Sequence, residues 1–231
     1  MSIKGVEWTS LVDFPGQICT TLFWDRCNMR CRFCHNAPLV LMSPELSAIN
    51  EALLLTKLQQ RKELVPAVCI SGGEPTLDPE LPVFIKRLKN LGFAVKLDTN
   101  GTQPDMLREL LAGNLIDYVA MDIKGPADKY NLIVNVPVDI KMIQDSIGLV
   151  RKMAPAYEFR TTVVPGLLEE SDIMAIGCEL AGVQKYVLQQ FKPSIRLLDR
   201  QLEKRKPYPD EFLYQVAAKL EAYVATVEVR C

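Results

Sequence analysis

Short apolar runs rich in β-branched residues alternate with helical patterns along almost the whole chain. Several runs are apolar at consecutive positions, which is typical of parallel strands that are buried on both faces. A strand followed by a helix, repeated six times, predicts an α/β fold in which a parallel sheet curls into a partial (β/α)6 barrel of TIM type. The runs occupy residues 17–24, 67–71, 93–99, 117–123, 157–164 and 184–191.

The helical patterns between these runs carry start and stop signals. Apolar residues recur at helical spacing over residues 81–88, after Asp78-Pro79, and Gly92 follows the pattern. A capping residue followed by proline favours a helix start, and glycine favours a helix end. Further helices are expected from Ser43-Pro44 to Leu58, after the capping residue Asp139, and over residues 213–223.

The composition favours one globular unit. With 231 residues, of which 48% are hydrophobic and 24% charged, the chain can bury a sizeable core without a second domain. We therefore expect a single domain over residues 1–231, with a core at about 12–191 and a C-terminal extension of helix and strand at 192–231. Only the charged stretch 192–207 resembles a linker.

Charge and hydropathy argue against several classes of partner. A net charge of −1 gives no bulk attraction to nucleic acid or to an anionic membrane surface. The first ten residues lack the layout of a signal peptide, and no apolar run approaches the roughly 18 residues of a membrane span. We expect a cytoplasmic protein that binds neither nucleic acid nor membrane.

The seven cysteines fit metal chemistry in a reducing compartment better than a disulfide framework, because their number is odd and no secretion signal precedes them. Cys19, Cys69 and Cys178 stand alone in apolar stretches, and we expect them to be inert thiols of the core. The remaining cysteines, apart from the C-terminal one, are clustered.

The stretch CNMRCRFCHN places Cys27, Cys31 and Cys34 within eight residues. Thiolates at this spacing can turn toward one metal centre, and thiolates are the usual ligands of iron–sulfur clusters. A fourth thiolate is missing nearby. The alternative is a zinc-stabilised interaction module with His35 as the fourth ligand, although adjacent Cys34 and His35 would have difficulty in occupying two corners of one tetrahedron.

Polar segments lie at the ends of the predicted strands, where parallel α/β barrels gather their reactive groups. SGGEP at 71–75, DTNG at 98–101 and DIK at 122–124 end or follow successive runs, and Arg160 lies within the fifth run. Such a rim could bind a small polar ligand beside a metal. A purely structural interpretation stays open, because the aspartates could cap helices and Arg160 could pair with a buried carboxylate.

CNMRCRFCHN followed by SGGEP resembles the radical S-adenosylmethionine (SAM) superfamily, and FCHN with LDTNG and MDIK resembles its glycyl-radical-activating branch. That branch contains the pyruvate formate-lyase activating enzyme and the activating protein of anaerobic ribonucleotide reductase, of which the second is more similar. The resemblance extends from Val12 to the sixth predicted strand and implies the partial barrel of that superfamily. It also explains the missing thiolate, because in the family three cysteines hold a [4Fe-4S] cluster whose fourth iron binds SAM.

The resemblance assigns a role to each polar segment. Gly73 and Glu74 would meet the methionine amino group of SAM, and Phe33 would lie against its adenine. A monovalent cation is expected near residues of DTNG and MDIK, namely Asp98, Thr99 and Asp122. The implied metal ligands are Cys27, Cys31 and Cys34, and the implied SAM contacts are Phe33, His35, Gly73, Glu74, Asp98, Asn100, Asp122, Lys124 and Arg160.

The same resemblance implies an oxygen-sensitive oxidoreductase that cleaves SAM reductively, while the protein binds and orients the reactants. The expected target is a glycyl-radical enzyme of the anaerobic ribonucleotide reductase kind, and the expected electron donor is a flavodoxin or ferredoxin. Two departures from formate-lyase activases favour this target: Asp13-Phe14-Pro15-Gly16 replaces an Asp-Gly-Pro-Gly turn, and Phe191 replaces a late-strand histidine. The alternative is a small-molecule enzyme similar to 7-carboxy-7-deazaguanine synthase.

Overall fold

The computed structural model of the chain describes residues 3–193 and 197–231. The contacts among its residues divide it into two compact units, each assembled from several segments of the chain. The expectation of a single domain over the whole chain stays a prediction. Unit 1 contains the residues up to Asn28 with Pro38–Ala120 and Met142–Ala156, and unit 2 contains Met29–Ala37, Met121–Lys141 and Tyr157–Cys231.

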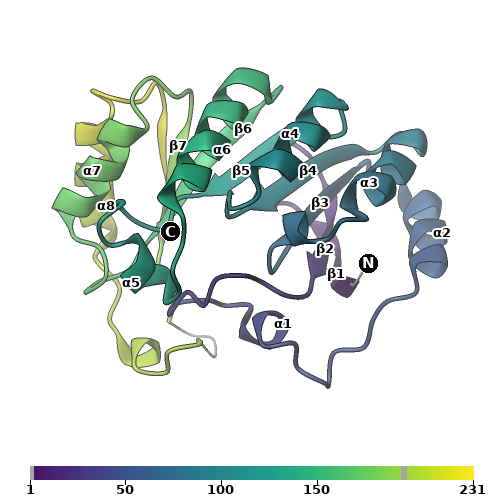
Figure 1. Cartoon of the computed structure of the whole chain (residues 1–231), viewed down its shortest axis with the longest axis horizontal. Coiled ribbons are helices and arrows are strands. Elements are labelled where there is room, and N and C mark those ends of the chain that lie inside the picture. The colour runs from purple at the N-terminus through teal and green to yellow at the C-terminus, as the bar shows by residue number, and fades with distance from the viewer. Residues whose placement is uncertain (1–2, 194–196) are drawn as a thin grey trace. The chain divides into compact units, whose positions relative to one another are not determined.

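The strands of unit 1 are β1 (Ile3–Ser10), β2 (Cys19–Trp24), β3 (Ala67–Gly72), β4 (Ala94–Thr99) and the first part of β5 (Tyr118–Asp122) (Figure 1). Their order in the sheet is their order along the chain. β1 pairs with β2 in the antiparallel sense, whereas β2, β3 and β4 run parallel. The carboxyl ends of these parallel strands therefore lie at the same edge of the sheet, as the sequence predicted.

The helices of unit 1 include α3, which follows the predicted spacing. It buries Leu81, Phe84, Ile85 and Leu88 and contacts β4, and Gly92 follows it with φ +78°. Its N-cap is Glu80, two residues later than Asp78-Pro79 suggested. The helices that lie wholly or partly in unit 1 are α1 (Ala37–Val40), α2 (Glu51–Arg61), the 3-10 turn η1 (Pro75–Leu77), α3 (Leu81–Asn90), α4 (Pro104–Ala112) and α6 (Ile140–Met153) (Figure 1).

The predicted helix start at Ser43-Pro44 is wrong. The N–H of Ser43 donates to the Pro38 carbonyl at 2.9 Å, which closes a turn, and the helix itself begins only at Glu51. The reason is the cap, because the Asn50 side chain accepts the N–H of Leu53 at 3.1 Å and satisfies a donor that the first helical turn leaves unpaired.

Unit 2 carries the remaining strands, again in chain order and parallel where they pair. The end of β5 joins β6 through the N–H of Ile123, which donates to the Arg160 carbonyl at 2.8 Å. α7 lies beside α8, which contacts β7 and β8 (Figure 1). The elements are α5 (Tyr130–Val134), β6 (Tyr157–Val163), α7 (Glu170–Glu179), β7 (Tyr186–Gln190), the 3-10 turn η2 (Leu202–Lys204), α8 (Asp210–Leu220) and β8 (Val227–Arg230).

All the strands predicted from apolar runs are present, and the structure has two further strands, β1 and β8, that no apolar run predicted. β1 includes charged residues, and β8 is short and only half-buried at each position. Cys19 and Cys69 are buried, as expected, but Cys178 is exposed on α7, so its assignment to the core is wrong. No helix in the described part of the chain has the length and hydrophobicity needed to cross a bilayer.

Candidate functional site

The SGGEP turn at the end of β3 depends on its two glycines. Gly72 has φ +113°, and a Cβ on it would lie 2.5 Å from backbone atoms of Trp24. A Cβ on Gly73 would lie 1.7 Å from the carbonyl oxygen of Arg26. The backbone passes this close because the N–H of Gly73 donates to the Trp24 carbonyl at 2.9 Å and that of Glu74 to the Arg26 carbonyl at 2.8 Å. The turn is thereby fixed to the chain that leads into the cysteine loop.

The Glu74 side chain joins its own turn to the DTNG turn after β4. It is 1% exposed. Its carboxylate accepts the Thr99 hydroxyl at 2.8 Å, the Thr76 N–H at 3.2 Å and the Asn100 N–H at 2.6 Å. Burial raises the pKa of Glu74, and these donors oppose that rise only in part. Glu74 thus has a structural task, and the contacts of Gly73 and Glu74 with SAM stay a prediction.

Asn100 connects the DTNG turn to the start of the cysteine loop. Its Nδ2 donates to Asn28 Oδ1 at 3.0 Å and lies 3.8 Å from the sulfur of Cys27. Its Oδ1 accepts the Thr102 hydroxyl at 2.7 Å, and Asn28 Nδ2 donates to the same hydroxyl at 2.8 Å. This amide network holds Cys27 in unit 1 and gives its sulfur an N–H donor.

Asp98 is held by two residues of unit 1 that sequence reasoning did not select. The Ser71 hydroxyl donates to Asp98 Oδ2 at 3.0 Å, and the ammonium of Lys96 pairs with Oδ1. The Lys96 side chain is 1% exposed, and its Nζ also lies 3.7 Å from the sulfur of Cys69. The signal in the sequence was a lysine two residues before Asp98 within an apolar strand.

In unit 2 the cysteine loop is anchored by its backbone. The N–H of Arg30 donates to the Val134 carbonyl at 2.9 Å, and that of Cys34 donates to the Cys31 carbonyl at 3.0 Å. The guanidinium of Arg32 donates twice to Asp199 Oδ2, at 2.9 and 2.6 Å. α5 and the segment around Asp199 therefore hold Cys31 and Cys34 in place without using their side chains.

The thiols of Cys31 and Cys34 lie close to the ammonium of Lys124. Burial raises the pKa of Cys31 to about 11, and Lys124 opposes the rise. Burial likewise raises the pKa of Cys34, which Lys124 and Arg30 oppose. Without a metal these thiols are protonated at neutral pH, so a metal must displace their protons in order to bind.

Asp122, at the end of β5, lies between two cations. Lys124 Nζ is 2.9 Å from Oδ2, and the Nε of Arg160 donates to Oδ1 at 2.8 Å. Burial alone would raise the pKa of Asp122, but Arg160 and Lys124 outweigh it and hold that pKa well below its usual range. Burial would lower the pKa of Lys124, and Asp122 reverses this. The cluster therefore stays charged at neutral pH. Arg160 pairs with a carboxylate, as the structural alternative held, and its contact with SAM stays a prediction.

Phe33 and His35 flank Cys34. Phe33 is 6% exposed, and Lys124 Nζ lies 5.9 Å from the centre of its ring. Burial lowers the pKa of His35, and its hydrogen bond to the backbone of Lys192 opposes that shift only in part. Its Nε2 is buried and has no hydrogen-bond partner among residues 3–193 and 197–231. The predicted contacts of both side chains with SAM stay predictions.

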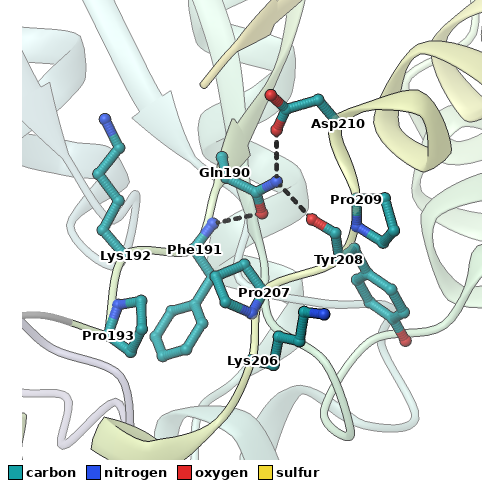
Figure 2. A pocket seen from close by; sticks show the side chains of 9 residues that line it. All are labelled: Gln190, Phe191, Lys192, Pro193, Lys206, Pro207, Tyr208, Pro209 and Asp210. Atoms are coloured by element: carbon teal, nitrogen blue, oxygen red, sulfur yellow. Dashed lines mark hydrogen bonds between the residues drawn. The ribbon is translucent and has the colours of Figure 1, made fainter.

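A cavity of about 550 Å³ lies where β7 ends, next to the segment before α8. Figure 2 shows Gln190 at its wall, where Nε2 donates to the Tyr208 carbonyl at 2.8 Å and to Asp210 at 3.0 Å. Phe191 also lines this cavity and is buried. The predicted SAM contacts do not line this cavity.

The model of the radical SAM superfamily matches residues 21–175, about two thirds of the chain, and this match includes the cysteine loop and the SGGEP, DTNG and DIK segments. The chain belongs to the radical SAM superfamily. Membership implies SAM and a [4Fe-4S] cluster as cofactors. The prediction made from the cysteine spacing and the strand-end segments is confirmed at this level.

Two relatives with assigned names are similar to this chain over most of its length. A protein of Methanocaldococcus jannaschii whose assigned name is glycyl-radical enzyme activating enzyme is 34% identical over 234 aligned residues, which cover 99% of this chain and 95% of the relative. The pyruvate formate-lyase-activating enzyme of Clostridium pasteurianum is 36% identical over 178 residues, which cover 74% of this chain and 71% of that enzyme.

The fold has close neighbours among solved structures. The radical SAM chain superposes on Streptococcus suis SuiB bound to its precursor peptide SuiA with a TM-score of 0.69 and 15% identity. The match covers 91% of this chain and 48% of SuiB, so the chain spans about half the length of that protein. The α/β architecture predicted from the alternating pattern, and its radical SAM barrel type implied by the resemblance, are confirmed.

The side chains present fit the cofactors that radical SAM membership implies. The seven cysteines, all within the described residues, form no disulfides, so the sulfurs of Cys27, Cys31 and Cys34 can serve as soft ligands. A molecule with an ammonium, a carboxylate and a ribose needs paired charges and hydroxyl acceptors, and the Asp122 cluster and the Asp98 carboxylate supply these chemistries. Sequence reasoning did not select four residues whose side chains contact Asp98 or Asn100, namely Ser71, Lys96, Asn28 and Thr102. Apart from the position of Lys96 two residues before Asp98, no local pattern in the sequence indicates these contacts.

Proposed function

We propose that this radical SAM protein activates a glycyl-radical enzyme. The observation that carries the proposal is the match over 99% of the chain, at 34% identity, to a protein assigned to that activity. The identity extends beyond the cysteine loop to nearly the full length of the relative. When bound, a reduced [4Fe-4S] cluster and SAM supply a 5′-deoxyadenosyl radical that removes a hydrogen atom from the target.

The residues of this chain would bind, orient and protect those cofactors. Cys27, Cys31 and Cys34 hold the cluster through three thiolates, and Asn100 orients the first of them from the DTNG turn. The charged groups of Asp122, Lys124 and Arg160 receive the amino-acid end of SAM, because a carboxylate flanked by two cations can exchange partners with an ammonium and a carboxylate.

The remaining predicted contacts complete the proposal. Asp98 and Asn100 receive the ribose, Gly73 and Glu74 frame the methionine amino group, and Phe33 and His35 border the adenine. The monovalent cation expected near Asp98, Thr99 and Asp122 stays a prediction and is not part of this proposal. The protein substrate we propose is a glycyl-radical enzyme of the anaerobic ribonucleotide reductase kind, supported by the FCHN, LDTNG and MDIK segments. A flavodoxin or ferredoxin is the proposed electron donor.

The experiment has two stages. The protein is purified anaerobically, reconstituted with iron and sulfide, and analysed for both elements. Alanine in place of Cys27, Cys31 or Cys34 should abolish the cluster, whereas Cys69→Ala should retain it. Stoichiometric zinc without sulfide would contradict the cluster assignment.

In the second stage the reconstituted protein, dithionite and SAM are mixed with candidate glycyl-radical enzymes, and electron paramagnetic resonance spectra are recorded. A glycine-centred doublet that disappears when the target glycine is changed to alanine supports activation. If a small metabolite is consumed while 5′-deoxyadenosine forms and no candidate gains a radical, a small-molecule reaction similar to that of 7-carboxy-7-deazaguanine synthase replaces the proposal.

A further inference from the structure

Lys96 is a buried lysine in the middle of an apolar strand. Its neighbours in β4, Val95 and Leu97, are fully buried, and its own side chain is 1% exposed. Transfer of an ammonium from water to such a position costs several kcal/mol unless a partner compensates it. The chain must therefore place a compensating charge beside it.

The position of Lys96 follows from the register of unit 1. Thr21, Cys69 and Lys96 pair across β2, β3 and β4, so their side chains form one row on one face of the sheet. Asp98 stands two residues further along β4 and points to the same face, one row closer to the carboxyl ends of the strands. Lys96 thus lies on the same face of the sheet as Asp98, one row further from the carboxyl ends of the strands.

The contacts agree with this arrangement. The ammonium of Lys96 pairs with Asp98 Oδ1, and the Ser71 hydroxyl donates to Oδ2 at 3.0 Å. Asp98 is 17% exposed in its side chain, so the carboxylate reaches the surface of the strand ends while the ammonium does not. A carboxylate has about four acceptor positions, and the donors of Lys96 and Ser71 fix the orientation of this one.

Stability does not explain why a lysine occupies this place. A buried ion pair is often no more stabilising than apolar residues of similar volume, and methionine would fill the same row without desolvation of a charge. A charge that is kept at this cost beside a candidate ligand-binding carboxylate points to a task at that carboxylate.

We propose that Lys96 is a positioning residue that supplies a built-in cation to Asp98, so that SAM binds without a monovalent metal cation at that carboxylate. The inference rests on the proposed role of Asp98 in SAM binding. It assigns to the ammonium of Lys96 the neutralising task that a bound potassium or sodium ion would otherwise perform. The ammonium is covalently attached, so its local concentration does not depend on the solution.

The test is SAM affinity in different salts. The reconstituted holoenzyme is titrated with SAM by calorimetry in chloride salts of potassium, sodium and tetramethylammonium at equal ionic strength. The dissociation constants of the wild type for SAM should agree within about twofold among the three salts. Lys96→Met should bind SAM at least about tenfold more weakly in tetramethylammonium and should recover in potassium or sodium.

Two controls separate this task from a merely structural one. Lys86→Met removes an exposed lysine of α3 and should bind SAM like the wild type in every salt. Lys96→Ala should regain affinity when n-propylammonium is added, because the small cation can occupy the space of the missing side chain. Circular dichroism verifies that each variant folds. If Lys96→Met does not fold, the double variant Lys96→Met/Asp98→Asn, which removes both charges, replaces it. This double variant should bind SAM weakly in all salts.

The outcomes are distinct. A wild type whose SAM affinity requires potassium or sodium overturns the inference, and so does a folded Lys96→Met variant that binds SAM with wild-type affinity in tetramethylammonium. A folded Lys96→Met variant that loses affinity equally in all salts also overturns it. A wild type that binds no SAM in any salt overturns the proposed function itself, and the inference with it.

Discussion

Lys124 Nζ lies 2.9 Å from Asp122 Oδ2, while Arg160 Nε donates to the other oxygen of the same carboxylate at 2.8 Å. All three side chains are mostly buried, with 25% of Asp122, 17% of Lys124 and 12% of Arg160 exposed. The Asp122 carboxylate therefore contacts two cations, one through each of its oxygens, and contributes to the charge balance of both.

We expect Asp122→Asn to destabilise the protein by about 3 kcal/mol, because removal of one partner leaves buried charges uncompensated. SAM affinity should fall as well, whereas the absorption of the reconstituted cluster should persist. Urea unfolding and SAM titration measure the two effects. Asp105→Asn is the matched control, since Asp105 is 94% exposed and should leave both quantities unchanged. A stable Asp122→Asn protein with wild-type SAM affinity would contradict this account.

The Glu74 carboxylate predicts a stability effect on the DTNG turn. Glu74→Ala should cost about 3 kcal/mol or more, because the donors of Thr99 and Asn100 lose a buried acceptor at once. Glu74→Gln should cost less, since its carbonyl oxygen keeps part of the set. Chemical denaturation gives the free energy of unfolding. Glu63→Ala, at an exposed position, is the control. Equal stability of all the variants would show that the Glu74 carboxylate does not hold the DTNG turn in place.

Asn100 predicts a change in cluster chemistry. Its Nδ2 lies 3.8 Å from the sulfur of Cys27. A hydrogen bond to a ligand sulfur stabilises the reduced cluster, which carries one more negative charge than the oxidised cluster. Asn100→Ala should therefore shift the reduction potential to a more negative value. A redox titration followed by electron paramagnetic resonance measures the shift. Asn90→Ala, at an exposed position on α3, should leave the potential in place, and a positive shift in Asn100→Ala would rule the explanation out.

Glu228 predicts part of the acid stability of unit 2. Its carboxylate accepts Arg230 Nε at 2.6 Å and lies 2.6 Å from Lys185 Nζ. The hydrogen bond from Arg230 lowers the pKa of Glu228 from 4.5 to about 2, burial opposes the shift, and Lys185 adds to it. Because the pKa is depressed on folding, the stabilisation is present above pH 4.5 and is lost as the pH falls toward 2.

Glu228→Gln should therefore reduce stability near neutral pH by about 1 kcal/mol or less, since the Glu228 side chain is 38% exposed and solvent screens its ion pairs. It should also flatten the loss of stability between pH 4.5 and about 2. Urea unfolding at a series of pH values measures both effects, with Glu221→Gln as an exposed control. An acid profile as steep as that of the wild type would argue against the ion pairs.

Local patterns in the sequence determined the order of the strands, the cysteine loop and the polar segments at the strand ends. Apolar runs report which backbone is buried, and the three thiols are neighbours along the chain, so neither inference needs long-range information. The same logic failed where the signal was weak. It placed a helix start at Ser43-Pro44 instead of at Asn50, and it assigned Cys178 to the core.

Only the tertiary structure decided which polar groups meet. Glu74 bonds to Asn100 across 26 positions, Asn28 bonds to Thr102 across 74, and Arg160 bonds to Asp122 across 38. Such partners become neighbours when parallel strands bring their ends to one edge, and nothing in the local periodicity encodes which side chains then touch. The pairing of Lys96 with Asp98 is local in the chain, yet its burial depends on the strands on either side of β4.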